Sequence, residues 1–334
     1  MITRSAFPRR TVLASWLALG LLTTATVLPA SPAFSQQSPS LGQLSVVYVD
    51  SHSPAYVPAA LGLKLGLWQK RGLDVKYLLV HGGGQANQLQ LAGRADLAIT
   101  GGITGIAAMV KGLSARFVGG FSSKYSGWVV VVTNESKAHS PADMKGKRIG
   151  ITSPGSLTEF LARKVPDAIT VPVGGFNEQM AALERGTTDG FVWPAEAAFT
   201  LEEKKAGRAA FDYGSLIKPN MIECLQATSG LIDNRPKALQ AYIDGYYEAV
   251  AYLKGHRKET IDFIAKEFST TDYVSSRLYD SIVDDVSGDG EVPMANLEEL
   301  ARVARDAGTI AQIPEVKAYW DGSFVPAKPD RVKY

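Results

Sequence analysis

The chain has 334 residues, of which 46% are hydrophobic and 20% charged, and its formal net charge is +2. This composition is typical of a globular protein and leaves no excess of positive charge for nucleic-acid binding. A single cysteine, Cys224, excludes an internal disulfide and a thiolate metal cluster. The length is sufficient for two domains, each with its own core.

The first 35 residues have the pattern of a secretory signal peptide. Three arginines precede an apolar run over residues 12–28, and a stretch of small residues follows it. We expect cleavage near Gln36 and a periplasmic location, and the pair Arg9-Arg10 also fits a twin-arginine export signal. The alternative is an uncleaved membrane anchor. Removing residues 1–35 takes away three arginines and no acid, which changes the formal charge from +2 to −1.

Short β-rich runs alternate with amphipathic helical stretches after residue 36, which predicts an α/β fold. Strands are expected at residues 44–49, 73–80, 97–100, 129–133, 148–152, 169–173 and 190–193. Helices are expected at residues 54–70, 85–92, 103–111, 236–253, 258–268 and 297–307.

One pattern recurs within the chain at a distance of 93 residues. Both copies read as strand, glycine loop, helix, Gly-x-x-Asp turn and strand, and they share the pairs Val80/Val173, Gly82/Gly175, Gly93/Gly186 and Asp96/Asp189. In each copy a glycine ends a helix and an aspartate occupies the turn that returns to the sheet. The repeat therefore predicts two similar α/β lobes.

Several short motifs together resemble a known family. They occupy residues 53–57, 66–68, 72–75, 93–98, 146–150 and 153–156. In order and spacing they resemble the substrate-binding proteins of ABC importers of the nitrate/sulfonate/taurine and thiamine-precursor (NMT1/THI5-like) type. His52, His81 and the pair Trp193-Pro194 do not fit one ligand subgroup of that family.

The resemblance implies a type II, Venus-flytrap fold of periplasmic binding proteins, with two α/β lobes joined by crossover strands. Lobe one would comprise residues 41–126 and 233–334, and lobe two residues 127–232, with hinges at 126–127 and 232–233. It further implies a monomeric solute-binding protein, without cofactor or catalytic activity, that delivers a small anionic organic molecule to an ABC permease. Membrane contact would be made through the permease alone.

The ligand site is expected beyond the carboxyl ends of the strands, where loops lead into helices. The candidate ligand-binding residues from these loops are His52, Tyr56, His81, Thr100, Gly101, Gly102, Ser153, Ser156, Thr158, Trp193 and Glu196. We expect no catalytic residue and no metal ligand among them.

Two of these loops are expected to present helix N-termini to an anionic group. Ser156 and Glu159 have the spacing of a capping box, and Gly101-Gly102 allow close approach of the backbone. A carboxylate, sulfonate or phosphate suits such a position. The alternative is that Ser156 only caps its helix and that the glycines only form a turn.

The remaining candidates have more than one interpretation. His52 and His81 either donate hydrogen bonds to a ligand, bind a metal with Asp50, or have a structural role. Trp193 either covers an aromatic or aliphatic ligand or packs in the core. Glu196 is either the N3 residue of a helix or the partner of a ligand amine.

Catalysis finds little support in the sequence. Gly-x-Ser-x-Gly, His-Glu-x-x-His and phosphate-loop motifs are absent from it. Two alternatives to transport remain open: an exported enzyme related to the thiamine-precursor synthases, and a ligand-sensing subunit of a membrane receptor.

Overall fold

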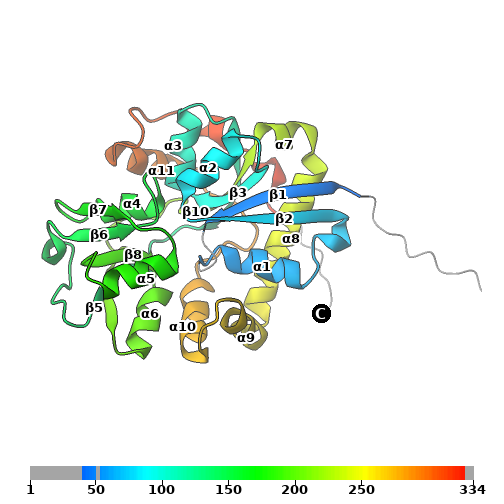
Figure 1. Cartoon of the computed structure of the whole chain (residues 1–334). Coiled ribbons are helices and arrows are strands. Elements are labelled where there is room, and N and C mark those ends of the chain that lie inside the picture. The colour runs from blue at the N-terminus through cyan, green and yellow to red at the C-terminus, as the bar shows by residue number, and fades with distance from the viewer. Residues whose placement is uncertain (1–39, 50–52, 328–334) are drawn as a thin grey trace, which may run out of the picture. The chain divides into compact units, whose positions relative to one another are not determined.

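The computed structural model describes residues 40–49 and 53–327 (Figure 1). The expected signal peptide, Asp50 and His52 lie outside these residues. Within the described part of the chain, no helix is long and apolar enough to cross a membrane.

A five-stranded mixed sheet contains the first part of the chain and one later strand. Its order is β2-β1-β3-β10-β4, in which β1 is parallel to β2 and β3, and β10 is antiparallel to β3 and β4. The strands are β1 (Gly42–Val49), β2 (Leu73–Val80), β3 (Leu97–Gly101), β4 (Ala115–Ser122) and β10 (Glu223–Thr228).

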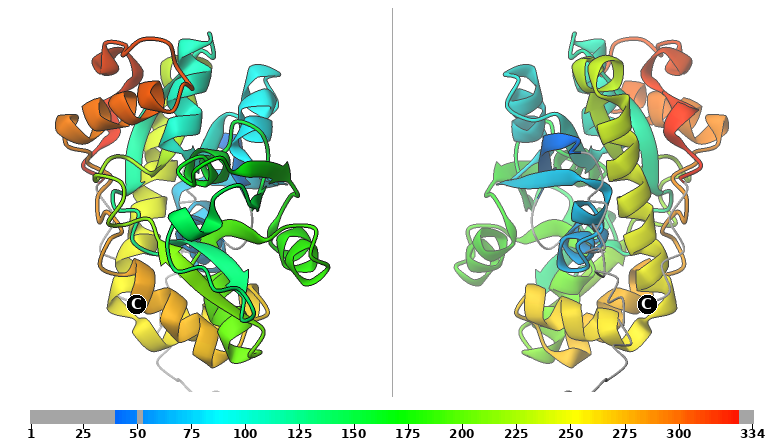
Figure 2. Two further views of the ribbon diagram at one scale, coloured as in Figure 1. Left: turned by 90° about the vertical axis from the view of Figure 1, so that its left-hand side faces the viewer. Right: turned by 90° about the vertical axis from the view of Figure 1, so that its right-hand side faces the viewer.

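The helices of this half come from both ends of the chain. They are α1 (Tyr56–Lys64), α2 (Gly83–Leu91), α3 (Gly102–Val110), α7 (Ser229–Asn234), α8 (Pro236–Gly255), α9 (Arg257–Glu267), α10 (Asp272–Ile282) and α11 (Met294–Asp306). The long helix α8 runs beside β2 and α1 (Figures 1 and 2). Its buried face carries Tyr242, whose ring stacks on Trp68 with centroids 5.2 Å apart. This packing joins the helix to the core of the first sheet.

A second mixed sheet of five strands contains the middle of the chain. Its order is β7-β6-β8-β5-β9, in which β6 is parallel to β7 and β8, and β5 is antiparallel to β8 and β9. The strands are β5 (Trp128–Thr133), β6 (Arg148–Ile151), β7 (Ile169–Pro172), β8 (Gly190–Pro194) and β9 (Gly207–Asp212), and the helices are α4 (Leu157–Ala162), α5 (Phe176–Glu184) and α6 (Glu196–Glu203). Short 3₁₀ turns lie at Gln69–Arg71, Ala142–Met144, Val316–Tyr319 and Gly322–Phe324.

The internal repeat is present in both sheets. The Asp96 carboxylate accepts a hydrogen bond from the backbone N–H of Ser45 at 2.9 Å, and Asp189 accepts one from that of Arg148 at 2.8 Å. In both copies the glycine three residues earlier has a positive φ, 67° in the first and 65° in the second. The same turn therefore returns the chain to an equivalent strand of each sheet.

The strands expected from the sequence are all present, and one helix is shorter than expected. The helix predicted for residues 54–70 ends at Lys64, because Gly66 adopts a left-handed conformation with φ 65°. Strands β4, β9 and β10 were not expected.

The chain passes between the sheets twice. It leaves the first sheet after β4, enters the second at β5, and returns between β9 and β10. Since β10 begins at Glu223 and pairs with β3 and β4, the return precedes residue 223 and differs from the boundary expected at residues 232–233. The passage from β4 to β5 covers residues 123–127.

Candidate functional site

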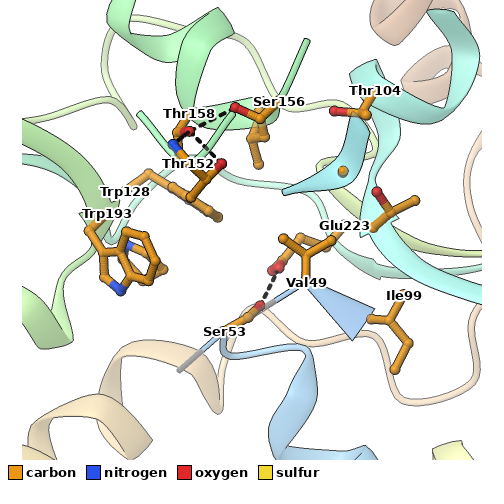
Figure 3. Close-up of a pocket in the computed structure, with 15 residues that line it drawn as sticks. Val49, Ser53, Ile99, Thr104, Trp128, Thr152, Ser156, Thr158, Trp193 and Glu223 are labelled. Carbon is orange, nitrogen blue, oxygen red and sulfur yellow. Dashed lines mark hydrogen bonds between the residues drawn. The ribbon is translucent and has the colours of Figure 1, made fainter. Parts of the chain in front are cut away.

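A small cavity lies between loops of the two sheets (Figure 3). Val49, Ile99 and Thr100 line it from the first sheet, and Trp128 and Trp193 line it from the second. Its volume is about 50 Å³, which is room for roughly three to five water molecules. The candidate site is therefore a narrow space between the two sheets.

One wall of the cavity consists of hydroxyl groups at the start of α4. Thr158 Oγ1 accepts a hydrogen bond from the backbone N–H of Thr152 at 2.9 Å and lies 2.8 Å from Ser156 Oγ. Ser156 Oγ also accepts a hydrogen bond from the backbone N–H of Glu159 at 3.2 Å, so the predicted N-cap is present. The Glu159 carboxylate reaches back to the backbone N–H of Gly155, at 2.6 Å. These bonds fix the hydroxyl groups in position.

A buried carboxyl group, Glu223, faces the same cavity. It is 7% exposed, and its Oε1 accepts a hydrogen bond from Ser53 Oγ at 2.8 Å (Figure 3). Burial raises the pKa of Glu223 to about 7, against the opposing effect of hydrogen bonds from Ser53 and Ser122 and with a small increase from Asp285. Among the described residues that line the cavity, Glu223 is the only one with an ionisable side chain.

Three polar atoms at the cavity have no hydrogen-bond partner in the described part of the protein. They are Thr100 Oγ1, Thr104 Oγ1 and Trp193 Nε1, in residues that are 3%, 4% and 2% exposed. Buried polar atoms of folded proteins are nearly always paired with protein, water or ligand. These three atoms therefore lack the partner that buried polar atoms usually have.

Aromatic rings form a further wall. Trp193 packs on Phe176 and Phe191, with ring centroids 5.8 Å and 6.4 Å away. Trp128 and Trp193 lie on one side of the cavity and Ile99 on the other (Figure 3). The cavity thus combines flat apolar surface with a few hydrogen-bonding groups, as ligand sites do.

Five of the residues expected in the site line this cavity: Thr100, Gly101, Ser156, Thr158 and Trp193. Glu223 and Ser53 were missed. The signal for Glu223 was a lone acid within the apolar run 221–225, at a place where no strand was expected.

The other described candidates lie outside the cavity lining. Tyr56 packs in the first core, where its ring stacks on Tyr48 at 4.2 Å, and burial raises its pKa. His81 is exposed. The Gly102 backbone N–H donates to the Ile222 carbonyl at 2.7 Å. Glu196 is fully buried as the first residue of α6, which is position N1 and not the expected N3.

Ser153 lies where loops of the two sheets touch. A Cβ atom added to Gly82 would lie 2.0 Å from Ser153 Oγ, and one added to Gly84 would lie 3.0 Å from the Pro154 carbonyl oxygen. Glycine is thus required at position 82 for the loops to approach this closely.

The described residues contain no group of three or more potential metal ligands. The sole thiol is also a poor nucleophile, because Cys224 is buried and burial raises its pKa. Its Sγ donates to the Thr100 carbonyl at 3.4 Å.

Comparison with protein families gives one match, to the model described as NMT1/THI5 like, over residues 51–260. No match was found among the curated proteins. The motif-based family prediction is therefore confirmed by the family model.

Solved structures with a similar fold include two sulfonate-binding proteins. The alkanesulfonate-binding protein SsuA from Xanthomonas axonopodis pv. citri, bound to MOPS, has a TM-score of 0.73 at 16% identity, covering 86% of this chain and 99% of its own. The aliphatic sulphonate binding protein SsuA from Escherichia coli has a TM-score of 0.68 at 18% identity. The match covers 87% of this chain and 96% of the Escherichia coli protein. The desulfurization enzyme DSZB is less similar, with a TM-score of 0.60 at 14% identity, covering 84% and 97%. The expected periplasmic-binding-protein fold with two α/β lobes is confirmed.

Proposed function

Since the chain belongs to the NMT1/THI5-like family, we propose that it is a periplasmic solute-binding protein that delivers a small organic molecule to an ABC permease. The fold supports this role, because solved sulfonate-binding proteins share it. The observation that carries the proposal is the cavity between the two sheets, where Thr100, Thr104 and Trp193 each present a buried polar atom without a protein partner. Export depends on the signal peptide predicted for residues 1–35.

The ligand is a small molecule with an anionic group. The hydrogen-bond donors at the cavity are hydroxyl groups and the Trp193 indole N–H, which suit a sulfonate or carboxylate. Trp128 and Trp193 provide the apolar surface for the body of the molecule. Thr100 comes from the first sheet and Trp193 from the second, so one ligand contacts both lobes.

Binding is coupled to closure of the two lobes. The hinges are the two passages between sheets, at residues 123–127 and 213–222. Lobe one comprises the described residues of 41–122 and 223–327, and lobe two residues 128–212. A ligand that contacts both lobes favours the closed arrangement, because those contacts are lost when the lobes separate. The permease then recognises the surface that the protein has when its two lobes are closed.

A thermal-shift screen of the mature chain tests this proposal. The panel contains alkanesulfonates, aliphatic and aromatic carboxylates, nitrate and pyrimidines, and each solution is assayed afterwards for chemical change. Saturable stabilisation without turnover supports solute binding. Product formation, or no stabilisation by any solute, contradicts it.

An enzymatic function is the second candidate, because the fold is shared with a desulfurization enzyme. The buried thiol of Cys224 opposes a thiolate mechanism, since its pKa is raised well above the usual value. The same turnover assay separates the two candidates.

A further inference from the structure

The carboxylate of Asp212 binds the backbone of both passages between the sheets. Asp212 is the last residue of β9, where the second passage (213–222) begins. Its Oδ1 accepts a hydrogen bond from the backbone N–H of Gly214, in that passage, at 2.6 Å. Its Oδ2 accepts one from the backbone N–H of Gly127, the last residue of the first passage (123–127), also at 2.6 Å. One side chain thus joins the two hinges at the edge of the second sheet.

The two passages also touch each other at this point. A Cβ atom added to Gly214 would lie 2.5 Å from Ser126 Oγ, so the close approach requires glycine there. The Gly127 carbonyl oxygen accepts a hydrogen bond from the backbone N–H of Ala195, just before α6, at 2.7 Å. Gly127 is therefore bound to the second lobe through its N–H, by Asp212, and through its carbonyl group, by Ala195.

The passages are joined a second time, next to the first sheet. The backbone N–H groups of Asn220 and Ile222 donate to the carbonyl oxygens of Ser123 and Ser122, at 2.9 Å and 3.0 Å. The hinge of a closing protein consists of a few residues that absorb the change in φ and ψ. Since both ends of the passages are joined, that change falls on the short segments between the two joins.

Two independent hinges would turn by different amounts and bring the lobes together in several orientations. Hinges that are joined at both ends turn together, so that Thr100 of the first lobe and Trp193 of the second meet in one arrangement around the cavity. We infer that Asp212 is a positioning residue for solute binding, which couples the two passages and thereby fixes the direction in which the lobes close. This inference rests on the proposed closure of the lobes around a solute.

Two substitutions separate this coupling from a local role of Asp212 in the turn after β9. Asp212→Asn keeps one acceptor oxygen and replaces the other by an NH₂ donor, so it can hold Gly214 or Gly127 but not both. Asp212→Ala removes both hydrogen bonds. Asp143→Ala is the control, because Asp143 is an exposed acid of the same lobe that accepts from the backbone N–H of His139 at 2.9 Å, outside both passages. Thermal melts verify that each variant folds.

Double electron–electron resonance measures the spread of lobe arrangements and requires no solute. Spin labels are attached through Leu91→Cys in the first lobe and Ile169→Cys in the second, at positions that are 72% and 56% exposed, whereas the native Cys224 is buried. We expect both Asp212 variants to give a broader distribution of label distances than the wild type and Asp143→Ala. Asp212→Asn carries the test alone if Asp212→Ala does not fold.

Affinity provides the second measurement, by calorimetry with a solute that the thermal-shift screen identifies. Both Asp212 variants should bind roughly three- to tenfold more weakly than the wild type, because apparent affinity falls with the fraction of molecules in the binding-competent arrangement. Asp143→Ala should bind as the wild type does.

The outcomes distinguish this inference from the proposed function. A wild-type distance distribution in Asp212→Asn overturns the inference, since the local turn alone would then be sufficient, and so does wild-type affinity in the folded variants. If no solute of the panel binds the wild type, the proposed function fails. The label distances then still show whether Asp212 couples the two passages.

Discussion

Arg277 of α10 and Glu202 of α6 form an ion pair, with Nη1 and Oε2 2.8 Å apart. Helix α10 packs in the core of the first sheet, whereas α6 packs on the second. The Arg277 guanidinium also lies 4.1 Å from the ring centroid of Phe199 in α6. Beside them, Thr271 Oγ1 donates to the Glu203 carboxylate at 2.8 Å. We call these five residues the outer contact, because they join the lobes away from the cavity.

Arg277→Ala is expected to weaken solute binding by favouring separation of the lobes. An exposed ion pair contributes about 0.2–1 kcal/mol and a cation–π contact about 0.5–1 kcal/mol, so affinity should fall roughly three- to thirtyfold. Calorimetry measures the affinity, and small-angle scattering measures the closed fraction. Arg257→Ala is the control, because Arg257 pairs with Asp280 of α10 within the first lobe, at 2.9 Å. Equal losses in both variants would remove the outer contact from the closure mechanism.

Gly82→Ala should hinder closure without straining the backbone. Gly82 has an extended backbone, with φ 175°, but its added Cβ would overlap Ser153 Oγ. Overpacking of this kind costs about 1–3 kcal/mol, which predicts a loss of affinity of roughly 5- to 100-fold. Calorimetry on Gly82→Ala measures the loss of affinity. Calorimetry on the double variant Gly82→Ala/Ser153→Gly measures whether the affinity is restored.

Gly230→Ala in α7 is the matched control, because an added Cβ there meets no atom within 4 Å. It should leave affinity unchanged. If the double variant binds no better than Gly82→Ala, the contact between residues 82 and 153 does not limit closure.

Stability should depend on pH through Glu223. Its pKa is raised from 4.5 to about 7 in the folded state, so the folded protein holds a proton that the unfolded chain releases between these values. Stability from this group is therefore greatest below pH 4.5 and decreases by about 3 kcal/mol as the pH rises through 7. Urea unfolding of the wild type and Glu223→Gln from pH 4 to pH 8 measures the difference. Parallel stability curves for the two proteins would contradict it.

Two substitutions separate the roles of Trp193. Trp193→Phe removes the indole N–H but keeps a ring against Phe176, so we expect little change in stability and roughly a tenfold weaker affinity for the solute identified by the screen. Trp193→Ala also leaves a cavity and should cost about 3–5 kcal/mol in the free energy of unfolding. Calorimetry and urea unfolding measure the two effects. Unchanged affinity in the Phe variant would show that the N–H does not contact the ligand.

The sequence predicts the two lobes well because their signals are local. Strands of β-branched residues, glycines at helix ends and the Gly-x-x-Asp turns can each be identified within a few residues. Asp96 and Asp189 make the same backbone hydrogen bond in their lobes, as their matching positions in the repeat indicate. The return crossing is not local: Glu223–Thr228 mixes polar and apolar residues, and its partners β3 and β4 lie more than 100 residues earlier.

The candidate site could be predicted only in part for the same reason. The rule that ligands bind beyond strand ends selects Thr100 and Trp193, which line the cavity. It also selects Tyr56, whose ring instead stacks between Tyr48 and Phe268 in the core. Which loop residue turns toward the cavity is decided by packing against distant parts of the chain. Glu223 belongs to the returning strand, so its position could not be inferred without that strand.

The placement of two tryptophans at the cavity gives the protein an intrinsic optical signal. Of the five tryptophans in the chain, Trp128 and Trp193 line the cavity, while Trp68 lies deep in the first core. A solute that enters between the lobes changes the surroundings of the first two indoles and leaves the third as an internal reference. Fluorescence emission can therefore follow the rate of ligand capture in real time on the unlabelled protein.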